Sequence, residues 1–184
     1  MVAVRRLFAH ADPALPFGAP RLRHTLTGVR SVAADGEYQG VAIRTDGSVW
    51  AWGYRGFVDC AAGTLASTPF QIANAANITA VSAGQDHTLL LRNDKAVLAY
   101  GCNGNRQLGQ SSQQVPPMSP AMVVAGLPPI KAVAAGAESS LALDEAGEVW
   151  AWGRKPGDRS ASSASNATPT KGGRPVWRDR YSPG

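Results

Sequence analysis

The sequence has 184 residues, a formal net charge of +5, two cysteines and 44% hydrophobic residues. That length can bury one sizeable core, but it contains no run close to the 18 apolar residues that a membrane-spanning helix needs. Residues 1–20 also lack the apolar run of a signal peptide, so we expect a cytoplasmic protein with no membrane partner.

The positive charge lies in the two flanks of the chain. Residues 1–30 carry five Arg against one Asp, and residues 154–184 carry seven basic against two acidic residues. Residues 31–153 carry six basic against ten acidic residues. Because a net acidic body is a poor match for phosphate groups, we do not expect a nucleic-acid partner.

Residues 1–19 are broken by Pro13 and Pro16, and we expect an irregular extension there. From residue 29 the chain repeats itself, because stretches similar to 29–53 recur at 78–101 and 130–153. Pro20, Pro69 and Pro120 precede the three copies by 9 or 10 residues. We therefore predict three repeat units, with the boundaries 20–68, 69–119 and 120–153.

Each copy contains two short runs of β-branched, apolar and aromatic residues, as strands do. The first run holds Val41 and Ile43, Leu89 and Leu91, or Leu141 and Leu143; the second ends in Val49-Trp50-Ala51-Trp52, Val97-Leu98-Ala99-Tyr100 or Val149-Trp150-Ala151-Trp152. Gly47 and Gly147 lie between the runs, where a tight hairpin often needs a positive φ. Each copy is therefore predicted to form a β-hairpin.

The second copy has Lys95 at the position of these two glycines. A lysine held at positive φ would cost on the order of 1 kcal/mol. This turn is therefore either strained or of another type, with Asn93 or Asp94 in the left-handed position.

The three copies resemble the regulator of chromosome condensation repeat. The resemblance lies in Val81-Ser82-Ala83-Gly84-Gln85-Asp86-His87-Thr88-Leu89 and in the later Gly101-Cys102-Asn103-Gly104-Asn105-Arg106-Gln107-Leu108-Gly109, where Arg106 replaces one glycine of the family pattern. It covers residues 20–153. The family's repeat is the unit of a seven-bladed β-propeller, which would need roughly twice 184 residues. The resemblance thus implies an all-β, open three-blade arc, or partial β-propeller of antiparallel sheets.

From Arg154 onward the sequence becomes rich in Ser, Pro, Gly and basic residues. Since such a segment cannot offset its ordering entropy, we expect residues 154–184 to be a low-complexity, disordered tail. Gly153 is followed by Arg154-Lys155-Pro156, so the blade pattern is expected to stop there.

The search for catalytic, cofactor-binding or metal-binding residues finds no candidate constellation. His87 occupies a position that holds Gln39 in the first copy and Ser139 in the third, and we interpret all three as structural hydrogen-bonding residues that bridge strands or blades. Asp144 and Glu145 are expected in a solvated turn. Cys60 and Cys102 fall at unrelated repeat positions and are expected to be free thiols.

These observations favour a non-enzymatic protein-interaction module or scaffold whose partner is another protein. The alternative is guanine-nucleotide exchange on a small GTPase, the activity of the family's founding member, although fold alone does not license that activity. An arc of three blades leaves two sheet faces without a neighbour. We therefore also expect self-association or docking to repeats of another polypeptide.

Overall fold

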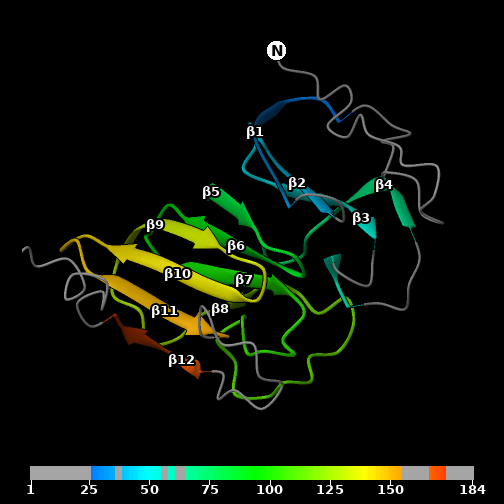
Figure 1. Ribbon diagram of the computed structural model, residues 1–184. Helices are drawn as coiled ribbons and strands as arrows, with labels where there is room; N and C mark the ends of the chain where they lie inside the picture. The colour runs from blue at the N-terminus through cyan, green and yellow to red at the C-terminus, as the bar shows by residue number, and fades with distance from the viewer. Residues whose placement is uncertain (1–25, 36–38, 55–57, 61–64, 155–165, 173–184) are drawn as a thin grey trace, which may run out of the picture.

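A computed structural model describes residues 26–35, 39–54, 58–60, 65–154 and 166–172. These residues form three four-stranded antiparallel sheets placed side by side in an open arc (Figure 1). We call the sheets blades 1, 2 and 3. The predicted all-β, partial-propeller architecture is therefore confirmed.

Each blade comes from one continuous stretch of chain. Blade 1 contains β1 (Val29–Asp35), β2 (Gln39–Arg44), β3 (Val49–Tyr54) and β4 (Leu65–Gln71). Blade 2 contains β5 (Ile78–Ala83), β6 (His87–Arg92), β7 (Val97–Gly101) and β8 (Met122–Val123). Blade 3 contains β9 (Ile130–Ala135), β10 (Ser139–Asp144), β11 (Val149–Gly153) and β12 (Asn166–Lys171). The strands of each blade are paired in the order of the chain.

The three predicted hairpins are the central strand pairs, β2 with β3, β6 with β7 and β10 with β11. Their register is the same in all three blades, since Gln39, His87 and Ser139 lie opposite Gly53, Gly101 and Gly153. The alignment of the copies is therefore also an alignment in space.

The blades are out of phase with the predicted repeat units by one strand. The boundary at 68/69 falls inside β4, and β8, which follows Pro120, pairs with β7 of blade 2 rather than with blade 3. The prolines therefore lie in or just before the outermost strand of a blade. A proline is tolerated there because the outer edge of an edge strand needs no ladder hydrogen bond.

The segment expected to be a disordered tail contributes a strand. Residues 166–171 form β12, which pairs with β11 through Trp150 opposite Lys171 and Ala151 opposite Thr170. For these residues the expectation of disorder is wrong, because pairing with β11 stabilises a sequence that has little apolar surface of its own. The other residues of the segment after Arg154, apart from Gly172, and the predicted extension 1–19 lie outside the described residues.

Alternation along the central strands gives every blade two distinct apolar faces. The forward face points toward the next blade in the chain and consists of Val41, Ile43, Val49 and Ala51; Leu89, Leu91, Val97 and Ala99; or Leu141, Leu143, Val149 and Ala151. The back face consists of Ala42, Trp50 and Trp52; Leu90, Leu98 and Tyr100; or Ala142, Trp150 and Trp152.

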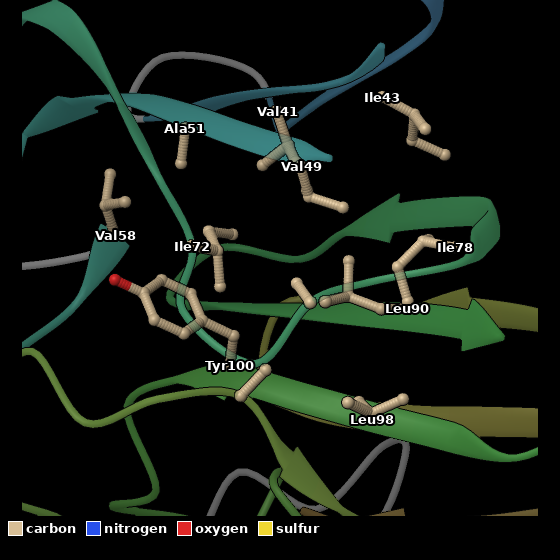
Figure 2. Close-up of a cluster of buried hydrophobic side chains, with 12 residues drawn as sticks. Val41, Ile43, Val49, Ala51, Val58, Ile72, Ile78, Leu90, Leu98 and Tyr100 are labelled. Carbon is tan, nitrogen blue, oxygen red and sulfur yellow. The ribbon is translucent and has the colours of Figure 1, made fainter. Parts of the chain in front are cut away.

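The hydrophobic core lies between blades. The forward face of blade 1 packs on Leu90, Leu98 and Tyr100 of blade 2 (Figure 2). The forward face of blade 2 packs in the same way on Ala142 and Trp152 of blade 3. Each interface thus joins two half-cores of different sequence.

Candidate functional site

A layer of polar side chains crosses the arc at one end of the central strands. It is formed by the residues that open β2, β6 and β10, namely Gln39, His87 and Ser139, and by the residues that follow two of them, Thr88 and Ser140. Gln39, Thr88, His87 and Ser140 are all 0% exposed. Buried polar groups need partners, so these contacts decide what the layer can do.

Gln39 joins blade 1 to blade 2. Its amide nitrogen Nε2 donates to the backbone oxygens of Gly84 and His87, the latter at 3.1 Å, and its Oε1 accepts from Thr88 Oγ1 at 3.4 Å. One side chain therefore binds three groups of the neighbouring blade.

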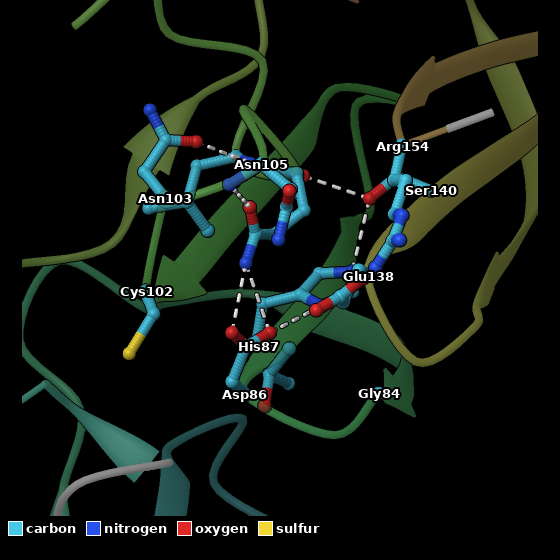
Figure 3. A network of polar contacts seen from close by, with 12 residues as sticks. Gly84, Asp86, His87, Cys102, Asn103, Asn105, Glu138, Ser140 and Arg154 are labelled. Atoms are coloured by element: carbon cyan, nitrogen blue, oxygen red, sulfur yellow. Dashed lines mark hydrogen bonds and ion pairs between the residues drawn. The ribbon is translucent and has the colours of Figure 1, made fainter. Parts of the chain in front are cut away.

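His87 joins blade 2 to blade 3 from the equivalent position (Figure 3). Its Nε2 lies 2.9 Å from Ser140 Oγ, and Ser140 Oγ lies 2.7 Å from the backbone oxygen of Gln107. The indole Nε1 of Trp152 donates to the same oxygen at 2.8 Å. Gln107 is in turn oriented by Asp86, whose two carboxylate oxygens accept from its Nε2 at 2.9 and 3.0 Å.

The proton positions in this network follow from its acceptors. The carbonyl of Gln107 has no proton, so the Ser140 hydroxyl must donate to it and accept from Nε2–H of His87. A serine nucleophile would need the opposite arrangement, with its proton directed at an unprotonated imidazole nitrogen. The contacts of His87 and Ser140 are therefore those of a structural bridge.

Gly84 shows how closely the two blades approach at this layer. A Cβ atom built on Gly84 would lie 2.2 Å from the backbone oxygen of Gly136 and 2.6 Å from the His87 ring. Only glycine allows the Gly136 carbonyl of blade 3 to lie this close to blade 2. This contact explains the glycine in the repeated Val-x-x-Gly motif.

Cys60 and Cys102 form a disulfide, so the expectation of free thiols is wrong. Their Cα atoms lie 5.3 Å apart, within the range of a disulfide. Cys60 follows β3 in blade 1, and Cys102 directly follows β7 in blade 2. The sequence held no signal for this pairing, because the two residues occupy unrelated repeat positions and are brought together only by the stacking of the blades.

Asp144 is not solvated, contrary to the expectation. It ends β10, is 6% exposed, and accepts from Trp150 Nε1 at 2.9 Å and from the backbone N–H of Glu148 at 2.8 Å. The hydrogen bond from Trp150 and then that from Glu148 lower the pKa of Asp144 below its ordinary value. Glu145 is exposed, as expected of a turn residue.

Lys95 itself takes the left-handed position in the hairpin of blade 2. Its φ is 71°, close to 80° at Gly47 and 86° at Gly147. Its backbone N–H donates to the oxygen of Arg92 at 3.0 Å, as the corresponding glycines do in their hairpins. Of the two alternatives left open by the sequence, the strained turn is the one observed.

Other kinds of site were sought in the described residues. In that part of the chain no three His, Cys, Asp or Glu side chains are grouped as ligands of a metal ion would be. No helix within the same residues is long and apolar enough to cross a membrane.

The forward face of blade 3 differs from the other two forward faces. Leu141 and Val149 are 37% and 45% exposed, whereas the equivalent Leu89 and Val97 are 0% and 1% exposed. Ala132 and Ala134 of β9 extend this apolar surface on the same side of the sheet, opposite Leu143 and Leu141. Blade 3 therefore presents an uncovered face of the kind that is a core in blades 1 and 2.

The sequence matches models of the regulator of chromosome condensation (RCC1) repeat at residues 46–91, 78–107 and 130–155. It is 31% identical over 132 residues to the RCC1 domain-containing protein RUG3, mitochondrial, of Arabidopsis thaliana. It is 33% identical over 115 residues to human protein RCC2. These alignments cover 68% and 60% of this chain but only 29% and 22% of the relatives.

Solved structures show the same fold. Human WBSCR16 superposes with a TM-score of 0.66 at 18% identity, over 79% of this chain and 38% of that one. Yeast RCC1 (Prp20), solved bound to Kap60, superposes with a TM-score of 0.65 at 23% identity, over 78% of this chain and 37% of that one. The repeated sequence, the three blades and these relatives together show that the chain belongs to the regulator of chromosome condensation repeat family.

Proposed function

We propose that the chain is a non-enzymatic protein-interaction module built from β-propeller blades. The observation that carries this proposal is the contrast between its polar and apolar residues. The buried polar groups Gln39, His87 and Ser140 are engaged in holding blades together. The apolar forward face of blade 3 is open and offers a surface for another protein.

Relatives support an interaction role. One structure of the yeast relative has Kap60 bound to it, and another reports the binding properties of that protein toward Gsp1p and histones. Since this chain spans little more than a third of those proteins, their partners are candidates to be tested here. Nucleotide exchange on a small GTPase is the alternative that the family raises.

Two measurements test the proposal. The purified full chain is first added to a small GTPase loaded with fluorescent GDP, and we expect nucleotide release at the intrinsic rate. A protein recovered with the immobilised chain from cells that express it is then purified and titrated against the chain, and we expect saturable binding. Accelerated GDP release would favour the exchange alternative, and the lack of any saturable protein partner would contradict the interaction role.

A further inference from the structure

The two covered forward faces show what kind of surface this apolar pattern accepts. Both are covered by the back face of a blade, and both covering blades place an aromatic side chain two residues after the start of an apolar pair, Tyr100 in blade 2 and Trp152 in blade 3. These aromatic residues are 4% and 2% exposed. The covering surface is thus one defined half-core that occurs twice in the chain.

The polar layer repeats with the same logic. Gln39 of the forward side contacts Thr88 on the back side of the next blade, and His87 contacts Ser140 in the equivalent way. Ser139 occupies the corresponding position in blade 3. The bare backbone of Gly136 also corresponds to that of Gly84, against which the next blade packs its glycine carbonyl.

We propose that the forward face of blade 3 binds the back face of a further blade of this repeat type, carried by a second polypeptide. This inference rests on the proposed interaction role and names both the surface and the partner. The partner blade is expected to bring an aromatic side chain at the Trp152 position and a hydroxyl group at the Ser140 position, which Ser139 contacts.

These 184 residues do not supply that blade. Each of the three sheets takes more than 40 residues, whereas 13 residues follow Lys171. A second copy of the chain does not supply it in the same geometry either, because the back face of blade 1 is already buried, with Ala42 0% and Trp52 1% exposed. A separate polypeptide with a free back face fits the surface.

The test places a photo-cross-linking amino acid at position 149 in the full chain, in extracts of cells that express it. We expect cross-links to a peptide of another polypeptide that contains the aromatic-x-aromatic-Gly strand of the repeat. The same label at Val123, which is 52% exposed on β8, is the matched control and is expected not to cross-link to such a peptide.

Leu141→Glu provides the second arm. The side chain is partly exposed, so the variant is expected to melt like the wild type, while cross-linking from position 149 falls about tenfold or more because a charge enters the centre of the interface. Val149→Lys, read out by competition with the labelled wild-type chain, serves the same purpose if Leu141→Glu does not fold.

Three results would overturn the inference. They are cross-links to a second copy of this chain, cross-links to peptides without the repeat motif, and a yield no higher than at Val123. A partner that binds wild type and Leu141→Glu equally would also overturn it while leaving the interaction role intact. Failure of both chains to bind any protein would instead contradict the interaction role itself.

Discussion

Blades 2 and 3 have the same strand order and register, yet only blade 2 is covered on both faces. Leu89 and Leu141 occupy the same position of the same motif, but they are 0% and 37% exposed. Burial in this chain is therefore decided by position in the array and not by the residue's own blade. The energetic value of an identical motif must differ between the two blades.

The largest expected difference concerns these two leucines. Leu89→Ala removes side-chain atoms from a closed core and should lower the free energy of unfolding by about 2 to 5 kcal/mol. Leu141→Ala should change it by less than about 1 kcal/mol, because no cavity forms on an open face. Urea unfolding of both variants measures the difference, and equal losses would show that the face of blade 3 is covered.

The disulfide is the second difference, because it links blades 1 and 2 while the described residues hold no such link between blades 2 and 3. Closing a loop between cysteines 42 residues apart should stabilise the chain by about 4 kcal/mol in the chain-entropy account. Urea unfolding with and without a thiol reductant measures this effect. A Cys60→Ser, Cys102→Ser double variant is the control and should not respond to the reductant.

Titration of thiols in the folded, unreduced chain provides an independent check. Finding two reactive or denaturant-exposed thiols in that sample would contradict the disulfide.

The hairpin turns provide a third, smaller difference. Lys95→Gly should leave the stability unchanged or raise it by up to about 1 kcal/mol, because glycine adopts positive φ without the steric cost of a Cβ atom. The ion pair with Glu145, at 3.2 Å between half-exposed side chains, offsets little of this gain. Gly147→Lys is the matched reverse change and should destabilise by a similar amount, as thermal melts of both variants would show.

The smallest predicted effect is a pH dependence confined to blade 3. The depressed pKa of Asp144 means that its carboxylate stabilises the fold above its ordinary value of 3.8, and this contribution is lost as pH falls through the lower folded-state value. The stability difference between wild type and Asp144→Asn should therefore shrink as pH falls below about 4. Urea midpoints measured from pH 6 to pH 2 test this, and a constant difference would contradict it.

The central hairpins could be predicted because both of their faces are apolar and their turns carry glycine. The outer strands could not be predicted in this way, since β12 reads Asn-Ala-Thr-Pro-Thr-Lys and is stabilised by pairing rather than by its own burial. One signal for it was present in the sequence. Pro169 continues the series of Pro20, Pro69 and Pro120 at nearly the same interval, in a segment whose composition otherwise indicates disorder.

The polar layer was only partly predictable. The shared position of Gln39, His87 and Ser139 indicated a bridge, because each side chain can form hydrogen bonds. The partners Thr88, Ser140 and Gln107 could not be assigned, since they lie 33 to 49 residues away in sequence and meet the layer only when blades stack. The disulfide escaped prediction for the same reason.

The order of the strands has a consequence for how the chain folds during synthesis. Because every blade is one unbroken stretch of strands paired in sequence order, blade 1 can complete its own hydrogen-bond ladder once Gln71 has emerged from the ribosome. Its forward face then waits, uncovered, for Leu90, Leu98 and Tyr100. Each finished blade is thus a template for the next, and assembly proceeds by addition at one growing end. The last blade added always keeps that end open.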